Sequence, residues 1–363
     1  MRILGFMSGT SLDGVDAALL ETDGERLIAF GPARAVSYTA AQRRVLEAAV
    51  AMALSDRFPP FEPKAFADAE AVILETHLKL GREISEQSGP VDLIGFHGQT
   101  VLHRPDQHLT LQIGRPQALA DGLQIPVVGD LRIRDMQEGG QGAPIVPIYH
   151  AALAELRGLE KPVAFLNIGG VSNITWIGPD NALEAFDVGP GNGLIDQWVA
   201  AHGLGSCDTD GRLAGLGIAH ADVIRRMMEH PFFGLTGPRS LDRYDFNLDA
   251  VQSLSAEDGA ATLTAFTAEA VAHAVQALPE APRTWVLCGG GRHNKTLGHE
   301  LDRRLGGCHL AEDFGFRGDF VEAEAIAFLA ARSVRGLPIT FPGTTGTPRP
   351  TTGGKLYRPA PAP

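Results

Sequence analysis

The chain has few cysteines and no long apolar run, and these two shortages exclude whole classes of protein. Only three of its 363 residues are cysteines, Cys207, Cys288 and Cys308, and no two of them form a CxxC pair. This sparse usage indicates a reducing compartment and excludes a disulfide scaffold. No stretch approaches the ~18 consecutive apolar residues of a membrane helix, and the N-terminal apolar run breaks too early for a signal peptide. We therefore expect a cytoplasmic protein without a membrane partner.

The chain also lacks an excess of positive charge. Its 31 Lys and Arg stand against 43 Asp and Glu, a formal net charge of −12, so no basic field is present to attract nucleic acid. No HExxH or CxxC spacing indicates a zinc site. A small-molecule ligand is the expected partner. At about 150 residues per domain, the length predicts two domains with separate cores.

Two stretches of the chain show the same order of predicted elements. Each opens with an antiparallel meander of three short strands, and the first strand of each runs into a glycine-rich turn. This repetition predicts a duplicated α/β architecture. The predicted strands are Leu4–Phe6, Val15–Leu20, Leu27–Phe30, Leu93–Phe96, Leu109–Ile113, Ile125–Val128, Val163–Ile168, Ile174–Ile177, Leu183–Phe186 and Trp285–Leu287. The predicted helices are Ala40–Leu54, Ala65–Gln87, Leu194–His202, Ala214–Glu229, Ala256–Leu278, Asn294–Leu305 and Val321–Arg335.

Three further segments are predicted to be irregular. Phe58–Pro63 is a proline-rich break between two helices. Leu131–Pro147 is too polar for a core and too rich in glycine for a helix, so we expect an active-site loop at the crossing between domains. The tail from Gly336 clusters Pro, Gly and Thr and is expected to be a loop or a loosely attached strand.

The first glycine-rich segment, Gly9–Asp16, combines the groups that hold a phosphate. Its glycines let backbone approach an anion, Thr10 and Ser11 add hydroxyl donors, and its two aspartates suggest a metal counter-ion. The same residues are also typical of an ordinary hairpin turn, and taken alone the segment favours that reading. Comparable junctions at Gly169 and Gly289 favour a nucleotide site. Walker A and complete GxGxxG patterns are absent, so a different phosphoryl-transfer fold is needed.

Asp187 precedes the loop Gly189–Asn192, which proline stiffens and glycine opens. A carboxylate placed there fits a general base, worth about 10²–10⁴-fold in rate. It equally fits a cap of the helix expected from Leu194, and spacing does not decide between the two.

Four other polar side chains have both a functional and a structural reading. His97 is able to bond a substrate hydroxyl, but a lone histidine after an apolar strand is more often structural. Arg132, with Arg134, fits a clamp for a carboxylate or phosphate or a plain surface pair. Glu322 begins a helix, where acidic residues are expected in any case.

Eight motifs in order resemble the 1,6-anhydro-N-acetylmuramic acid kinase family, from residue 3 to about 335. They are MSGTSLDGVD at 7–16, GFHGQT at 95–100, GDLRIRD at 129–135, GGQGAPIVP at 139–147, NIGGVSNIT at 167–175, FDVGPGN at 186–192, CGGG at 288–291 and GDFVEAEAIAFLA at 318–330. The resemblance implies an α/β, two-lobed actin-like ATPase and sugar-kinase fold with a duplicated βββαβαβα core and an interdomain cleft. The expected lobes are residues 1–130 with about 320–363, and residues 131–319.

The resemblance also implies a reaction and its residues. ATP, with Mg²⁺, would phosphorylate O6 of 1,6-anhydro-N-acetylmuramic acid while water opens the ring, in cell-wall recycling, and the family suggests a homodimer. Asp187 would be the catalytic base, and substrate contacts would come from His97, Gln99, Arg132 and Glu322. Asp13 is the one candidate metal ligand. The implied ATP contacts are Gly9, Thr10, Ser11, Leu12, Asp13, Gly14, Val15, Asp16, Gly169, Gly170, Asn173, Gly189, Gly191, Asn192, Gly289, Gly290, Gly291 and Asn294.

The chain departs from the family pattern in two places near these residues. Val188 stands where the family usually has Thr after the catalytic aspartate, and Pro238–Arg243 replaces a Lys-Ser-Thr-Gly-Arg-Glu-like run. The second departure puts contacts from that segment in doubt. Two alternatives remain open: a sugar kinase of the same fold that consumes no water, and a non-catalytic nucleotide-gated binding protein.

Overall fold

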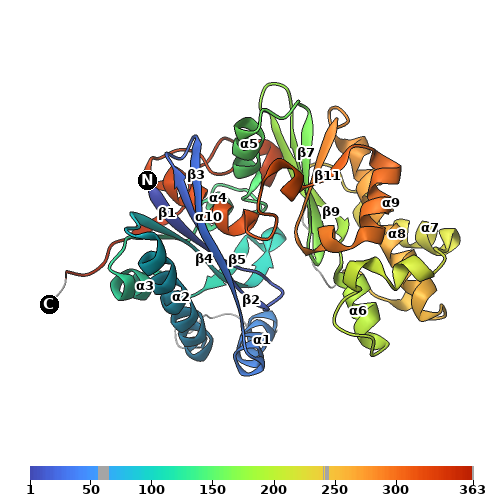
Figure 1. Cartoon of the computed structure of the whole chain (residues 1–363), viewed down its shortest axis with the longest axis horizontal. Helices are drawn as coiled ribbons and strands as arrows, with labels where there is room; N and C mark the ends of the chain where they lie inside the picture. Colours follow the sequence, from blue (N-terminus) through green and yellow to red (C-terminus); the bar gives the residue numbers. More distant parts are fainter. Residues whose placement is uncertain (56–64, 240, 242–244, 362–363) are drawn as a thin grey trace. The chain divides into compact units, whose positions relative to one another are not determined.

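The computed structural model describes residues 1–55, 65–239, 241 and 245–361, and it divides into two compact units (Figure 1). The first unit comprises Met1–Leu156 and Phe320–Pro363, and the second comprises Arg157–Asp319. The predicted proline-rich break at Phe58–Pro63 lies outside the described residues. Among the described helices, none combines the length and apolar character needed to cross a membrane.

The first unit is built on one mixed sheet. Strands β1 (Arg2–Ser8), β2 (Gly14–Thr22) and β3 (Leu27–Ser37) form the predicted antiparallel meander, and β4 (Leu93–Arg104) lies parallel to β1. The edge beyond β4 holds the short strands β6 (Val127–Gly129) and β12 (Lys355–Tyr357), in the order β12-β6-β4-β1-β2-β3. Strand β5 (Leu109–Ile113) pairs with the far end of β4 as a hairpin.

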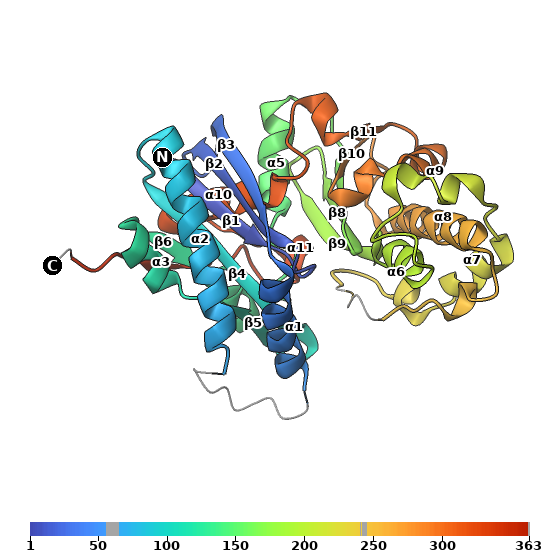
Figure 2. The ribbon, with the colours of Figure 1, turned by 60° about the horizontal axis from the view of Figure 1, so that its bottom comes forward.

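Helices cover both faces of this sheet. Side chains alternate between the two faces along each strand, so each face offers its own set of side chains to the helices that cover it. Leu4 and Phe6 belong to the core shared with α1 (Ala40–Leu54) and α2 (Ala67–Ser88). Figure 2 shows these two helices lying over one face of the sheet. Gly5 points the other way, and a Cβ there would lie 1.9 Å from the carbonyl oxygen of Ala323 in α10 (Val321–Val334). Gly5 pairs with Gly95 of β4, so two neighbouring glycines let the backbone of α10 rest directly on the sheet.

The second unit repeats this architecture. Strands β7 (Val163–Ile168), β8 (Val171–Ile177) and β9 (Leu183–Pro190) form a second antiparallel meander, and β10 (Thr284–Cys288) lies parallel to β7. With β11 (Cys308–Leu310), the strand order is β11-β10-β7-β8-β9, which matches β6-β4-β1-β2-β3 of the first unit. The predicted duplicated α/β fold is therefore confirmed by strand order and direction.

The remaining helices complete each unit. In the first unit these are α3 (Pro116–Leu123), α4 (Ile133–Gln137), α5 (Pro147–Leu156) and α11 (Pro342–Thr345), and in the second they are α6 (Gly193–Ala201), α7 (Ala221–Met228), α8 (Ala256–Ala274) and α9 (Lys295–Leu305). Helix α8 is buried along most of its length, and the apolar core of the second sheet includes its Ala268 and Val271.

Three predictions about local structure are wrong in part. Residues 131–147 are not all loop, because Ile133–Gln137 form α4 before the glycines begin. The helix predicted over Ala214–Glu229 is interrupted at Gly217, whose backbone is extended and packs too closely on Glu257 for a side chain. The tail is firmly attached, since β12 pairs with β6 and Thr345 donates a hydrogen bond to the buried Asp135 at 2.7 Å.

Candidate active site

The first glycine-rich segment is the tight turn between β1 and β2, so its hairpin reading describes the backbone correctly. The amide of Leu12 donates to the carbonyl of Gly9 at 3.3 Å, and Leu12 adopts a left-handed φ of 56° with its side chain buried. Thr10, Ser11 and Asp13 are exposed at the turn. The predicted contacts Gly14, Val15 and Asp16 lie in strand β2, with Val15 in the core. The segment therefore presents its hydroxyl groups from residues 10 and 11.

Strand β4 holds this turn in place. It continues through His97 and Gln99, which were expected to follow the strand rather than lie in it. Gln99 is fully buried, and its Nε2 donates to the carbonyl oxygen of Gly9 at 2.9 Å. Ser8 Oγ donates in turn to the carbonyl of Gly98 at 3.1 Å. The Oε1 atom of Gln99 has no hydrogen-bond partner among the described residues.

His97 and Arg132 form a pair. Arg132 Nε donates to His97 Nε2 at 3.0 Å, and His97 Nδ1 lies 2.8 Å from the carbonyl oxygen of Gly98. Because a guanidinium only donates, Nε2 is the acceptor and Nδ1 carries the proton. Burial and the charge of Arg132 lower the pKa of His97 to about 3. His97 is therefore neutral at physiological pH, and both of its ring nitrogens form hydrogen bonds within the protein.

Glu322 lies in the electrostatic field of two other predicted site residues. It begins α10, and burial raises its pKa, while the charge of Arg132 lowers it and that of Asp13 raises it. Arg132 also donates through Nη1 to the carbonyl of Gly142 at 2.7 Å. The first unit thus brings Asp13, His97, Arg132 and Glu322 into one neighbourhood, although they are far apart in sequence.

Sequence reasoning did not identify Asp135 as the residue that shapes the glycine cluster beside Arg132. Asp135 is buried, and its Oδ2 accepts the amide of Gly142 at 2.6 Å. A Cβ at Gly140 would lie 2.2 Å from the same oxygen, so only glycine fits there. Asp135 therefore fixes the loop whose Gly142 carbonyl receives Arg132.

In the second unit, three polar side chains lie in a row across the sheet. Asn167 of β7 pairs with Asn173 of β8, and Asn173 pairs with Asp187 of β9. Directly opposed residues of neighbouring strands share one face, so the three side chains form a polar ladder. Helix α6 begins at Gly193 with Asn192 as its cap residue, and Asp187 does not cap it. The capping interpretation of Asp187 is therefore wrong.

The second and third glycine junctions both contact the segment that ends in Asn192. The carbonyls of Gly169 and Gly170 accept the amides of Asn192 at 2.8 Å and Gly191 at 3.0 Å. A Cβ at Gly289 would lie 2.5 Å from Asn167 Oδ1, and one at Gly291 would lie 2.3 Å from Asn192 Oδ1. These contacts bring the predicted nucleotide residues of the unit together. The exposed members are Gly290 and Gly170.

Two predicted nucleotide contacts have structural roles as well. Asn294 caps α9, and its Oδ1 accepts the amide of Leu297 at 2.9 Å. Gly189 is buried inside β9, where a Cβ would lie 2.9 Å from Ala270. Both positions support the site from beneath its surface.

The third junction is held by a buried arginine that sequence reasoning missed. The Arg292 side chain is 1% exposed and donates to the carbonyl of Gly289 at 2.9 Å. It also forms ion pairs with Glu312 at 2.8 Å and Asp319 at 2.7 Å, and its charge lowers the pKa of both carboxyls. No signal in the sequence connects these residues.

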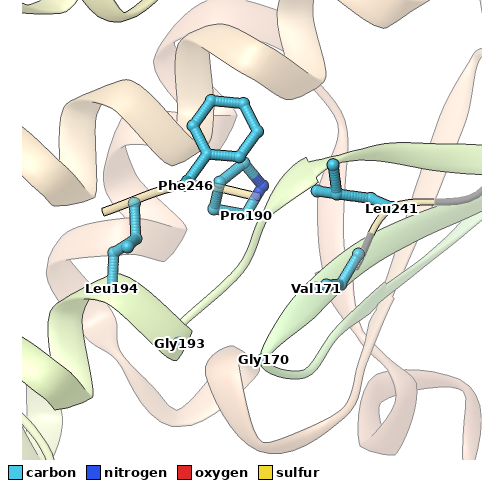
Figure 3. A pocket seen from close by; sticks show the side chains of 7 residues that line it. All are labelled: Gly170, Val171, Pro190, Gly193, Leu194, Leu241 and Phe246. Carbon is cyan, nitrogen blue, oxygen red and sulfur yellow. The ribbon is translucent and has the colours of Figure 1, made fainter. Parts of the chain in front are cut away.

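A small pocket of about 200 Å³ lies beside the second junction (Figure 3). Its walls come from the second glycine turn, the end of β9, the start of α6 and two residues further along the chain, namely Gly170, Val171, Pro190, Gly193, Leu194, Leu241 and Phe246. The side chains that line it are all apolar.

The described residues do not by themselves build a metal site. They contain no group of three or more His, Cys, Asp or Glu side chains that would hold an ion. Asp13, the candidate metal ligand, is exposed at the first turn and accepts a hydrogen bond from Ser11 Oγ at 2.8 Å.

Comparison with known proteins identifies relatives along the full length of the chain. Residues 1–359 match the family model of anhydro-N-acetylmuramic acid kinase. Curated proteins of that name from Phenylobacterium zucineum and Bradyrhizobium diazoefficiens are 49% and 46% identical, each over 99% of this chain and 100% of its own length.

Solved structures resemble the chain more distantly. A ROK family glucokinase from Streptomyces griseus is 14% identical, with a TM-score of 0.41 over 92% of this chain and 100% of that chain. The (R)-2-hydroxyglutaryl-CoA dehydratase component A of Acidaminococcus fermentans is 12% identical, with a TM-score of 0.47 over 92% of this chain and 99% of that chain. The fold assignment rests on the strand order instead.

Proposed function

The chain belongs to the anhydro-N-acetylmuramic acid kinase family, and we propose that it uses ATP and water to convert 1,6-anhydro-N-acetylmuramic acid into N-acetylmuramic acid 6-phosphate and ADP. Such a cytoplasmic enzyme would serve cell-wall recycling. The observation that carries the proposal is the family match from residue 1 to 359, which includes Asp187 and all three glycine junctions.

In the proposed reaction, Asp187 accepts a proton from water as the water oxygen attacks the anomeric carbon. The bond from that carbon to the bridging oxygen breaks, and O6 leaves with the electron pair. O6 then attacks the γ-phosphorus of ATP, and the bond from that phosphorus to the β-phosphate oxygen breaks to release ADP. Positioning and charge neutralisation supply most of the rate in phosphoryl transfer.

The described contacts support a distinct role for each group. Asn173 stands beside Asp187 in the polar ladder and is placed to share its hydrogen bonding. Arg132, held by neutral His97, carries a fixed positive charge for the sugar, and Glu322 lies in its field. Thr10 and Ser11 present hydroxyls for phosphate oxygens at the β1–β2 turn.

Magnesium in this proposal is held chiefly by the phosphates of ATP, with Asp13 as the one protein carboxylate proposed to reach it. When bound, the ion would neutralise part of the phosphate charge during the transfer. We also propose a homodimer, which light scattering of the purified chain would test.

The function is tested by incubating the protein with Mg-ATP and the anhydro-sugar in water enriched in ¹⁸O. We expect N-acetylmuramic acid 6-phosphate with ¹⁸O at the anomeric position in samples quenched before that position exchanges with solvent. A phosphorylated sugar without the label would indicate a kinase that consumes no water. Slow ATP hydrolysis that no sugar changes would indicate a nucleotide-gated binding protein.

A further inference from the structure

A buried arginine lies directly against the strand that carries the proposed base. Arg239 is 8% exposed, and its guanidinium carbon lies 4.3 Å from the ring centroid of Phe186, the residue before Asp187. A second ring, Phe232, lies 5.6 Å away. Burying a guanidinium is unfavourable unless its charge and its N–H groups are satisfied. The partners of Arg239 therefore indicate what it is there to hold.

Those partners converge on Asp187. Arg239 Nε donates to the carbonyl oxygen of Asp187 at 3.2 Å, and the Asp187 amide donates to the carbonyl of Arg239 at 3.0 Å. A third bond runs from Arg239 Nη1 to the carbonyl of Leu235 at 2.9 Å. The reciprocal pair joins the segment around Arg239 to β9 at one residue.

The same segment contacts the carboxylate itself. The amide of Leu241, two residues after Arg239, donates to Asp187 Oδ2 at 2.8 Å. A backbone amide has no rotamers, so it fixes the orientation of a carboxylate more firmly than a donor on a mobile side chain does. Leu241 also lines the 200 Å³ pocket, so its placement sets one wall of that pocket as well.

We propose that Arg239 is a positioning residue for Asp187: it docks its segment on β9 so that the Leu241 amide holds the carboxylate in one orientation. The inference rests on the proposed function, in which Asp187 is the base. The sequence placed this segment among departures from the family pattern, whereas the structure places it in direct contact with Asp187.

A lysine would replace this arginine only in part. The planar guanidinium of arginine donates hydrogen bonds in two directions while it lies flat on the Phe186 ring, and the single ammonium group of lysine cannot do both. A glutamine at the same position would lose the charge and the ring contact together. The two substitutions therefore form a graded series in which the docking weakens stepwise.

The test measures kcat, the KM for the anhydro-sugar, and ADP affinity by calorimetry for Arg239→Gln and Arg239→Lys in the full chain. We expect kcat to fall about 10- to 100-fold in the glutamine variant, as for a misplaced catalytic group, with partial recovery in the lysine variant. ADP affinity should stay within about twofold, because the proposed nucleotide residues keep their own contacts. The control is Arg226→Gln, which removes an exposed i,i+4 pair on α7 and should leave kcat unchanged.

Asp187→Asn, measured alongside, separates the inference from the function. If that variant keeps most of the parental rate, Asp187 is not the base and the positioning role of Arg239 fails with it, whereas the conversion of the anhydro-sugar itself stands. If it is inactive while Arg239→Gln turns over at the parental kcat, the function stands and the positioning role is refuted. Should the glutamine variant fail to fold, the lysine variant decides, since a parental kcat there would equally overturn the role.

Discussion

The third glycine junction allows a test that separates folding from nucleotide binding at adjacent residues. Gly289 has φ of +73°, and a Cβ there would lie 2.7 Å from the carbonyl oxygen of Ile168. Gly290 is exposed, and the atom nearest to a Cβ placed there would be Asn192 Nδ2, at 3.8 Å. We therefore expect Gly289→Ala to destabilise the fold and Gly290→Ala to leave stability unchanged.

The magnitude for Gly289→Ala follows from two costs. The backbone of Gly289, with φ of 73° and ψ of 170°, lies in a region almost exclusive to glycine and costs a residue with a Cβ about 1–3 kcal/mol, and forcing that Cβ against backbone adds about 1–3 kcal/mol. A total of about 2–6 kcal/mol corresponds to a fall in Tm of roughly 4–24 °C, at roughly 2–4 °C per kcal/mol for a unit of this size. Gly298→Ala is the matched control: it lies inside α9 with no atom within 4 Å, and it should gain roughly 0.5–1 kcal/mol.

The assay combines thermal unfolding with calorimetric titration of ADP. If Gly290 lies against the nucleotide, as proposed, Gly290→Ala should weaken ADP binding while its Tm stays at the parental value. A large loss of Tm in Gly290→Ala, or none in Gly289→Ala, would refute the reasoning from backbone geometry. Parental ADP affinity in Gly290→Ala would instead remove Gly290 from the nucleotide site.

Three further predictions concern single side chains. Asp187→Asn should lower kcat by about 10²–10⁴-fold with ADP affinity nearly intact, and steady-state kinetics with calorimetry check this. Burial and the nearby charge of Asp208 raise the pKa of Asp196 from 3.8 to about 6, so between pH 4 and 6 the folded state retains a proton that the unfolded state has lost, and the free energy of unfolding falls as the pH rises through this range. In thermal unfolding, Asp196→Asn should therefore be more stable than the parent by up to about 2 kcal/mol at pH 8 but not at pH 4. His77 packs between Phe6 and Phe96, and burial lowers its pKa to about 4. Between about pH 6.5 and 4 the unfolded state therefore binds a proton at His77 that the folded state does not, so the free energy of unfolding falls as the pH falls through this range. His77→Phe should show a smaller drop in Tm between pH 7 and pH 5 than the parent.

Much of the fold could be predicted because apolar periodicity and turn residues act locally. The meanders at both sheets, helix α1 and the glycine junctions all follow from patterns within a few residues. The errors arose where contacts between residues far apart in the sequence determine the local structure. Gly217 interrupts a helix-like stretch because of its contact with Glu257, and the Thr-rich tail is held in place by Asp135 and β6.

The site was predictable to the extent that its residues lie in glycine-rich motifs. Asp187 was predicted as the base from its motif and stays a prediction, but only the strand register distinguishes a residue inside β9 from a helix cap. Arg239 and Arg292 were missed because their partners are separated in sequence and joined only by packing. A buried arginine has no local signature, since what makes its burial tolerable is the set of acceptors around it.

Comparison of the two duplicated units shows that only the second has a carboxylate at the position of the proposed base. In each unit, the residue two positions before the first glycine of the junction begins a row across the meander. In the second unit this row is Asn167, Asn173 and Asp187, and in the first unit it is Met7, Asp16 and Ala35. The third-strand position is thus a carboxylate in one unit and an exposed methyl group in the other. Duplication repeats the backbone, whereas chemistry depends on the side chain at one register position, so the first unit has no equivalent group to replace Asp187 when it is substituted.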